Sequence, residues 1–443
     1  MNIELFKSIL LTLLVILSGL LTWNIWSYQP PLDAIEQPAS TVDIAIADER
    51  TNKELIKPSR FLVHGDETIR GTSSGNEMNE IGTLMQEWSL FNLRENTSLN
   101  EEEFEEVVHG SNRIEIIFPA QVPFTMYQDV LNFEVSQLPD ATFDRMVVKM
   151  PERENTTFTV YFVSYDDRRV FEAKVEREEF ESFNEATVEN AEEKYPAHFE
   201  YRADNRLLYL PQASNEVLQY NYVMDEISEL QFRNALFQDV NDVDVNSISS
   251  NKKQYFDQSS LMEVDDGAKV INYVNPSVGR STIPAGPADL LQKSQRFINE
   301  HKGWTDTYYL YNLDIVSHRV TYRMHVQGLP VFNDKGKSNI AQIDMQWGEN
   351  RIYKYDRSFM EMQVQVPSNT QTASIASGYD VIEAIEERED YDPALLQDVV
   401  VGYFMSEDTR EEDLYTLEPM WFYLYNGSWQ RVPLDGGDPV GLE

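Results

Sequence analysis

Residues 8–26 read SILLTLLVILSGLLTWNIW and contain no charged side chain. A helix that crosses a lipid bilayer needs about 20 consecutive apolar residues, so this stretch has the length and composition of a membrane span. Trp23 and Trp26 stand near its C-terminal end, where aromatic rings favour the membrane–water interface, and Pro30 and Pro31 then end any helix. A cleaved signal peptide is the alternative. Signal-peptide cleavage sites carry small residues, whereas the residues at the C-terminal end of this stretch are bulky. We therefore predict that the segment is retained as a membrane anchor.

The charges that flank the segment predict its orientation. Lys7 precedes it, and the first positive charge after it is Arg50. Lys and Arg mark the cytoplasmic side of a membrane span. We therefore expect residues 1–27 to form a short cytoplasmic tail and a single transmembrane helix. The rest of this single-pass plasma-membrane protein is expected to be extracytoplasmic.

One face of the predicted anchor carries mostly small and hydroxyl side chains. Spacings of three and four residues place six positions on a single helical stripe: Ser8, Thr12, Val15, Gly19, Thr22 and Trp26. Small residues let helices approach closely in lipid, and hydroxyls can hydrogen-bond across the contact. The stripe is therefore our candidate partner-binding face. Hydrogen bonds from Ser and Thr to carbonyls of their own helix are the alternative interpretation.

Composition restricts the function of the remaining chain. The 443 residues carry 75 acidic and 36 basic side chains, a net charge of −39, which repels nucleic acid and anionic lipid. No cysteine is present, which excludes disulfides, thiol catalysis and thiolate metal sites. Hydrophobic residues make up 42% of the chain, enough for folded cores. We expect a folded, acidic ectodomain that is not a nucleic-acid-binding protein.

Helical and strand patterns alternate along this ectodomain. Residues 28–58 are polar and proline-rich, as in a tether. Three α+β units are predicted to follow, at 59–195 beside the membrane, 196–284 in the middle and 285–443 at the C-terminus. The expected architecture is a set of antiparallel sheets with helices packed on one face.

Two local patterns inside these units make specific predictions. Apolar residues recur at helical spacing between residues 224 and 238, which predicts a helix there. Val320, Tyr322, Met324 and Val326 alternate with polar residues, which predicts a strand with one apolar face.

Several motifs resemble catalytic or metal sites, but each lacks an essential part. Gly71–Gly75 reads GTSSG and matches G-x-S-x-G, yet polar residues precede it, so a flexible loop is expected rather than a nucleophile elbow. Asp242–Asn246 begins like a calcium loop, but Ser247 stands where glycine is required. His318 and His325 are seven apart and would face opposite sides of a strand.

The other histidines are isolated in the sequence: His64, His109, His198 and His301. Neither a metal-ligand set nor a phosphate-binding loop is recognisable. We therefore predict no catalytic residues, no metal, no cofactor and no enzymatic activity.

Four passages resemble a known family. They read KSILLTLLVILSGLLTWNIWSYQP (7–30), YFDQSSLMEVDDGAKVINYVNPS (255–277), RFINEHKGWTDTYYLYNLD (296–314) and YRMHVQGLPVFN (322–333). They are similar to the YycH family of Gram-positive membrane proteins. The resemblance implies an accessory regulator of the WalK-type sensor histidine kinase, which governs cell-wall metabolism in a two-component system. It also implies a companion single-pass protein, YycI, whose outer domain resembles the C-terminal unit.

Two other functions remain open at this point. The ectodomain could sense a wall fragment or small molecule and relay its occupancy, which requires an apolar pocket with converging polar groups. A wall hydrolase would instead require paired carboxylates about 5–9.5 Å apart in a cleft.

Overall fold

A computed structural model describes residues 11, 17–19, 48–97, 99–150, 156–204, 206–279, 283–301, 303–334, 339–366, 371–408, 411, 413–434 and 441–442. The chain divides into two units, residues 1–43 and 44–443. In the first unit, Leu11 and residues 17–19 are helical. Within the described parts of the chain, no helix has the length and apolar character needed to cross a membrane. Most of the predicted anchor lies outside the described residues, so it stays a prediction.

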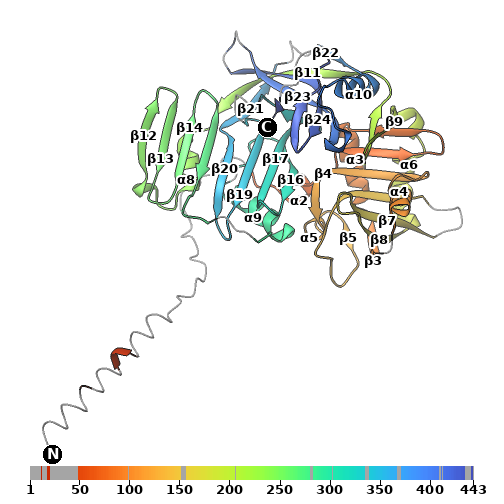
Figure 1. The fold of residues 1–443 in the computed structure, drawn as a ribbon, viewed down its shortest axis with the longest axis horizontal. Helices are drawn as coiled ribbons and strands as arrows, with labels where there is room; N and C mark the ends of the chain where they lie inside the picture. Colours follow the sequence, from red (N-terminus) through yellow and green to blue (C-terminus); the bar gives the residue numbers. More distant parts are fainter. Residues whose placement is uncertain are drawn as a thin grey trace, which may run out of the picture. The chain divides into compact units, whose positions relative to one another are not determined.

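The first half of the second unit is built on a ten-stranded sheet with the order β10-β9-β2-β1-β4-β6-β7-β8-β3-β5 (Figure 1). Neighbouring strands are antiparallel, except that β3 and β5 run parallel. The strands are β1 (Arg60–His64), β2 (Ile69–Thr72), β3 (Ser89–Asn96), β4 (Arg113–Pro123), β5 (Asn132–Phe133), β6 (Thr142–Lys149), β7 (Thr157–Ser164), β8 (Arg169–Glu176), β9 (Ala197–Ala203) and β10 (Arg206–Pro211). Strands β4 and β6 are buried along most of their length.

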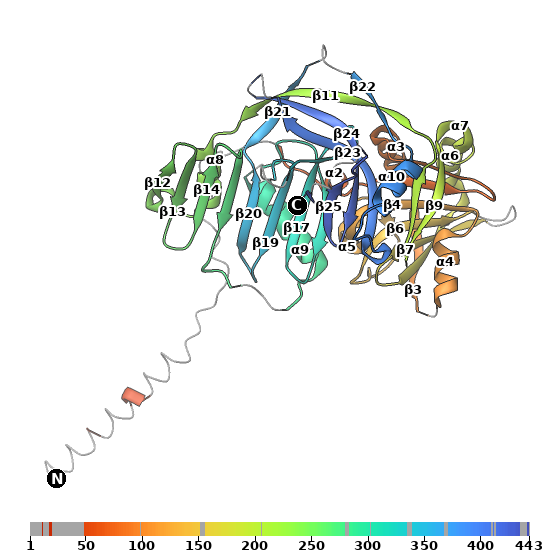
Figure 2. The same ribbon diagram turned by 45° about the horizontal axis from the view of Figure 1, so that its top comes forward.

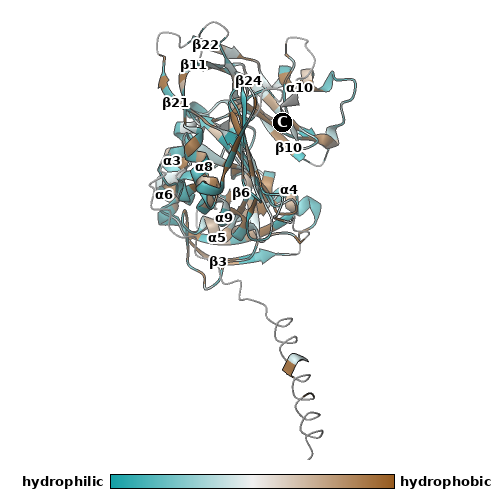
Figure 3. Cartoon of the chain, turned by 90° about the vertical axis from the view of Figure 1, so that its left-hand side faces the viewer, coloured by the Kyte–Doolittle hydropathy of each residue, from teal (hydrophilic) through white to brown (hydrophobic). Residues whose placement is uncertain are grey.

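Helices cover both faces of this sheet. They are α2 (Asn52–Leu55), α3 (Gly75–Met85), α4 (Glu101–His109), α5 (Phe124–Tyr127), α6 (Arg177–Thr187) and α7 (Ala191–Lys194). Met146 and Val148 of β6 join the core that includes α3 and α6, whereas Val147 packs with Phe104 and Val108 of α4. Because successive strand residues point to opposite faces, α4 lies across the sheet from α3 and α6 (Figure 3). Our prediction that helices cover one face is wrong for this sheet, since both of its faces are apolar.

The start of α4 shows how local sequence defines an element. The Asn100 side chain accepts a hydrogen bond from the Glu103 backbone N–H at 3.0 Å, and the Glu103 carboxylate accepts one from the Asn100 N–H at 2.9 Å. This reciprocal capping box satisfies two backbone donors that a helix start leaves unpaired.

The second half of the unit is built on a larger sheet, which has sixteen strands in the described residues. Twelve of them follow one path, in the order β12-β13-β14-β15-β20-β19-β17-β18-β23-β24-β11-β21. Its strands are β11 (Asn215–Glu226), β12 (Asp244–Ser249), β13 (Lys252–Phe256), β14 (Leu261–Asp265), β15 (Val270–Val274), β16 (Tyr308–Asp314), β17 (Arg319–Val326), β18 (Leu329–Phe332), β19 (Gln342–Trp347), β20 (Ile352–Ser358), β21 (Met360–Gln365), β22 (Gln371–Ile375), β23 (Leu396–Glu407), β24 (Leu414–Tyr425), β25 (Ser428–Arg431) and β26 (Gly441–Leu442). Strands β18 and β23 run parallel. The long strand β11 pairs in turn with β22, β24 and β21 (Figure 2).

The helices of this half are α8 (Glu229–Leu236), α9 (Pro287–Glu300) and α10 (Gly378–Glu386), with short 3-10 turns η1 (Val240–Asp242) and η4 (Pro393–Leu395). The helix expected between residues 224 and 238 is shorter than predicted, because β11 continues to Glu226. Met224 there pairs with Met362 of β21. Strand pairing formed in the tertiary structure outweighs helical periodicity at this position.

Strand β17 is buried on both faces, although its sequence predicts one polar face. Thr321, Arg323 and His325 are all buried. The Arg323 guanidinium lies 4.7 Å from the Tyr311 ring centre and 4.3 Å from the Phe332 ring centre, and it donates to the Val331 carbonyl at 3.0 Å. Buried polar groups require such partners.

The two sheets meet at several contacts between their edges and turns. Gly75, at the start of α3, packs so closely against Gly328 that a Cβ on either residue would overlap the other backbone segment. Gly328 has φ +83°, a conformation that glycine adopts freely. Arg60 of β1 forms an ion pair with Asp398 of β23 at 2.8 Å.

Strand pairing assigns β9 and β10 to the first sheet and β12–β15 to the second. Pairing alone does not decide which parts fold independently, so the three predicted units (59–195, 196–284 and 285–443) stay a hypothesis.

Candidate functional site

The stripe predicted on the anchor lies almost wholly outside the described residues. Gly19 is described and is helical, whereas Ser8, Thr12, Val15, Thr22 and Trp26 are not described. Their role as a partner-binding face stays a prediction.

A buried ionic network occupies the first sheet beside its junction with the second. Glu115 of β4 is fully buried at its centre. Arg145 of β6 donates to Oε1 of Glu115, while His64 Nε2 lies 3.1 Å and His109 Nδ1 3.7 Å from Oε2. An ionised carboxylate only accepts hydrogen bonds, so the proton between His64 and Glu115 belongs to His64 Nε2. Strand pairing produces this convergence, since β4 lies between β1 and β6.

The network shifts the proton affinities of its members. Burial alone would raise the pKa of Glu115, but the charge of Arg145, the nearby His109 and the hydrogen bond from His64 hold that pKa well below its usual range. Burial lowers the pKa of His109 despite the neighbouring carboxylate. Burial also raises the pKa of Asp144 to about 6, against the attraction of Arg145. At neutral pH this region therefore holds an ionised Glu115 beside an uncharged His109.

Tyr165 connects the network to the protein surface. Its hydroxyl is hydrogen-bonded to His109 Nε2 at 3.0 Å and accepts from the Leu207 N–H at 3.3 Å. The Arg145 guanidinium carbon lies 3.8 Å from the centre of the Tyr165 ring, and those of Arg168 and Arg206 lie 4.7 and 5.2 Å away. Cations over an aromatic face are attracted by its quadrupole, so Tyr165 holds three arginines together.

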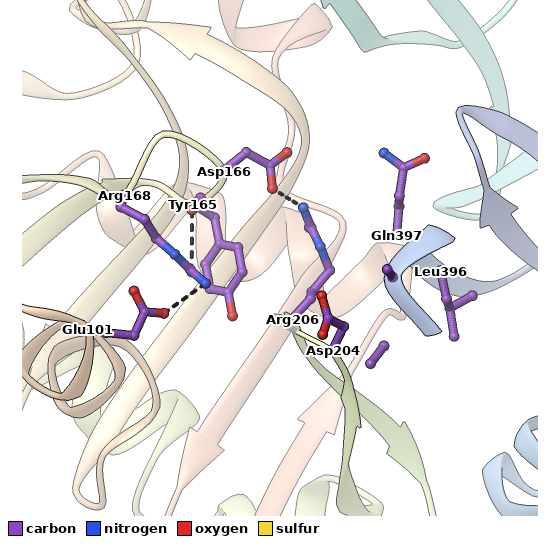
Figure 4. Close-up of a pocket in the computed structure, with 10 residues that line it drawn as sticks. Glu101, Tyr165, Asp166, Arg168, Asp204, Arg206, Leu396 and Gln397 are labelled. Carbon is purple, nitrogen blue, oxygen red and sulfur yellow. Dashed lines mark hydrogen bonds and ion pairs between the residues drawn. The ribbon is translucent and has the colours of Figure 1, made fainter. Parts of the chain in front are cut away.

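These arginines line a cleft between the two sheets. A cavity of about 560 Å³ is bounded by the β7–β8 turn, the β9–β10 turn, the start of α4 and the η4–β23 segment. Figure 4 shows Arg168 paired with Glu101 and Arg206 paired with Asp166 on one side of the cavity, with Leu396 and Gln397 on the other. A second cavity of about 230 Å³ shares Asp166, Arg206 and Gln397, and extends toward β4, β6 and β16. The two cavities form one polar cleft, which we call the junction cleft.

A second buried network lies within the larger sheet. Arg357 donates to the Gly303 carbonyl, to the Ser358 carbonyl at 2.9 Å and to Thr305 Oγ1 at 3.1 Å. Burial lowers the pKa of the neighbouring His301 to about 3. Because Arg357 is fully buried and these groups bond to one another, the network fixes the turn after α9 against β20 and offers no opening to a ligand.

The chain just beyond the predicted tether's midpoint is held against α9. Asn299 accepts a hydrogen bond from the Arg50 N–H and donates to the Arg50 carbonyl, both at 3.0 Å. Gln295 donates to the same carbonyl at 2.8 Å, and Trp304 Nε1 donates to Asn299 Oδ1 at 2.6 Å. We call this arrangement the Arg50 clamp. It secures the entry of the chain into the folded unit.

The structure places the two stretches that resemble a nucleophile elbow and a calcium loop in sequence. In the Gly71–Gly75 stretch, β2 ends at Thr72 and α3 begins at Gly75, so only Ser73 and Ser74 connect them and the flexible loop predicted there is wrong for the rest. Gly71 and Gly75 are buried, and Gly75 makes the junction contact described above, whereas Ser74 is exposed. Asp242–Asn246 lies on η1 and β12. In the described part of the chain, no three His, Cys, Asp or Glu side chains are grouped so that they could hold a metal ion.

Sequence inspection treated His64 and His109 as isolated and missed their convergence on Glu115. One signal was available in the sequence. Glu115 and Arg145 are opposite charges inside strands that are otherwise strongly apolar, and buried charges require partners.

The fold is thus a largely antiparallel α+β protein of two sheets with helices, and a polar cleft lies where the sheets meet. The chain belongs to the YycH family: residues 4–192 match the YycH protein N-terminal domain, and residues 205–437 match the YycH protein C-terminal domain. The resemblance seen in the sequence is therefore confirmed.

Two similar proteins support this assignment. The Bacillus subtilis (strain 168) protein described as "Two-component system WalR/WalK regulatory protein YycH" is 22% identical over 98% of this chain and 97% of its own length. The crystal structure of YycH from Bacillus subtilis has a TM-score of 0.73 and 18% identity, covering 88% of this chain and 99% of that one. At this identity the structural likeness shows the fold.

Proposed function

We propose that this chain is an accessory regulatory protein of a two-component system that contains a WalK-type sensor histidine kinase. The observation that carries the proposal is the match to the WalR/WalK regulatory protein of Bacillus subtilis, which extends over 98% of this chain. Both family domains are present and cover nearly the whole sequence.

Features of the described residues support a non-enzymatic role. Ser73, the residue that a G-x-S-x-G motif would use as nucleophile, has no histidine among its hydrogen-bond partners in the described chain. A catalytic serine needs such a base within hydrogen-bond reach. Glu115, His64 and His109 do lie together, but Glu115 is fully buried and bonded to Arg145, as in a structural ion pair.

The proposed route to the kinase is the predicted anchor. A single-pass helix with the N-terminus in the cytoplasm would place the stripe Ser8, Thr12, Val15, Gly19, Thr22 and Trp26 against transmembrane helices of the kinase or of a YycI-type companion. If contact with the stripe stabilises one arrangement of the kinase's transmembrane helices over another by about 1–3 kcal/mol, that difference is enough for regulation. The Arg50 clamp supports this route, because it joins the chain that leads to the anchor to helix α9 of the folded unit.

Crosslinking tests the proposal. A photoreactive residue placed at Gly19 should capture the kinase or the companion protein in membranes, while the same residue at Leu13, off the stripe, should capture less. Gly19→Leu should also change expression of the kinase's target genes, with protein abundance checked by blotting, whereas Leu13→Ala should not. Equal capture and equal gene expression from both positions would contradict a signalling role for the stripe.

The junction cleft favours a second candidate function, an extracytoplasmic ligand sensor, although its lining is polar and not the apolar one expected for such a sensor. Its main cavity, of about 560 Å³, falls in the range of about 300–1,000 Å³ typical of small-molecule sites.

A further inference from the structure

The junction cleft is a pre-organised polar surface. Arg168 lies 3.0 Å from Glu101, and Arg206 is paired with Asp166. The carboxylates Glu101 and Asp166 are 60% and 65% exposed, but both guanidiniums also lie over the Tyr165 ring. The arginines are therefore positioned before any ligand arrives, which lowers the entropic cost of binding. The cleft therefore has the construction of a binding site.

The charges of the cleft select against anions. Its four arginines are each paired with a carboxylate: Arg60 with Asp398, Arg145 with Glu115, Arg168 with Glu101 and Arg206 with Asp166. Asp144 and Asp204 add further carboxylates to the lining. A ligand with a negative charge would meet this carboxylate excess, and would also enter the field of a chain with a net charge of −39.

The remaining groups of the lining suit hydroxyls and amides. Gln121, Asn312 and Gln397 carry amide groups, which can donate and accept. The Gln121 oxygen already accepts from Ser164 Oγ at 3.3 Å and the Gln397 oxygen from the Gly427 N–H at 2.6 Å, so these two residues offer a ligand mainly their amide N–H donors. Asn312 of β16 is exposed, and Gln397 comes from β23 while Gln121 comes from β4. Donors and acceptors that converge from three strands match a molecule with many neighbouring hydroxyl or amide groups and no negative charge.

We infer that the junction cleft binds an uncharged saccharide of one or two rings. The site is built from both sheets, since Arg206 and Asp166 belong to the first and Gln397 and Asn312 to the second. A bound saccharide would bridge the two sheets and stabilise their contact. This inference deepens the proposed regulatory function, on which its biological role rests, because occupancy of the cleft would be the input that the regulator reports.

Binding is tested on the full chain in lipid nanodiscs, without alkyl-glycoside detergents, whose sugar headgroups would compete. Isothermal titration calorimetry is run with three probes: cellobiose, N,N′-diacetylchitobiose and glucose 6-phosphate. At least one uncharged disaccharide should bind with a millimolar or lower Kd, and glucose 6-phosphate should bind at least tenfold more weakly.

Two variants locate the binding. Ala394→Trp places a large side chain at the exposed rim of the main cavity and should abolish binding. Asn312→Ala should weaken it about tenfold. The matched controls are Ser250→Trp and Asn246→Ala, which change exposed residues on or beside β12, away from the cleft lining. They should bind as the unmodified chain does.

The inference is overturned if neither uncharged disaccharide binds, if the phosphate sugar binds as tightly, or if both cleft variants bind normally. The Asn312→Ala variant keeps the test decisive should Ala394→Trp not fold. Because the measurement needs no kinase, its failure is separate from failure of the regulatory proposal, which the crosslinking experiment tests.

Discussion

Replacing Glu115 by glutamine should strongly destabilise the folded unit. The change keeps the size of the side chain but removes the charge opposite Arg145, which is 4% exposed. It also turns one acceptor oxygen into an amide donor, which must face the donor group of either Arg145 or His64.

The magnitude follows from these contacts. Hydrogen bonds to charged groups contribute about 1.5–3 kcal/mol each, and Glu115 accepts two, from Arg145 and His64. Leaving a buried charge unpaired costs about 3–5 kcal/mol, which agrees with that range. We expect the free energy of unfolding to fall by about 3–5 kcal/mol. The double change Glu115→Leu with Arg145→Met removes both charges and should cost less than Glu115→Gln alone.

Urea denaturation followed by tryptophan fluorescence measures the effect. The control is Glu106→Gln, because Glu106 is 70% exposed in its 3.4 Å pair with Arg113, so its loss should change stability by less than about 0.5 kcal/mol. The pKa of Glu115 is lowered in the folded state, so its contribution is present above the unfolded pKa and is lost as pH falls through the folded one. The difference between wild type and Glu115→Gln should therefore shrink in acid. A Glu115→Gln variant as stable as Glu106→Gln would refute this account.

Three further outcomes are expected. Gly328→Ala should destabilise the protein far more than Gly279→Ala in the same urea assay, since a Cβ at Gly328 overlaps Gly75 and its φ is +83°, whereas Gly279 has open space. Acidification below about pH 6.5 should lower stability, by up to about 1.4 kcal/mol per pH unit for each histidine concerned. The reason is that desolvation lowers the folded pKa of four histidines: His109, the half-buried His198 (to about 4), His301 (to about 3) and His325 (to about 3). Between about pH 4 and 6, Asp144 and Asp306 oppose this loss of stability, because burial raises the folded pKa of each to about 6. Urea denaturation midpoints at pH 7.5, 6.0 and 5.0 measure the net change in stability with pH. A midpoint that does not fall toward pH 5.0 would contradict the lowered histidine pKa values. Asn299→Ala should speed amide hydrogen exchange and proteolysis around Arg50 without unfolding the sheets, and unchanged exchange there would show that the Arg50 clamp is not needed.

Local chemistry is sufficient to define some elements of this fold. Asn100 and Glu103 form the capping box at the start of α4, and Asp266-Gly267 stand in the turn between β14 and β15, so both features follow from short-range chemistry. The error at residues 224–238 arose where a strand continues through residues with helical spacing. Periodicity describes which residues are apolar, but the partner that buries them decides between helix and strand.

The sequence by itself determined the α+β class, the acidic character and the family, because these depend on composition, periodicity and contiguous motifs. Only the tertiary structure decided that His64, His109, Glu115 and Arg145 meet. The reason is that β1, β4 and β6 are neighbours in the sheet although they are far apart in the chain. The junction cleft has the same origin, because its walls come from turns and strands of both sheets, which no local pattern relates.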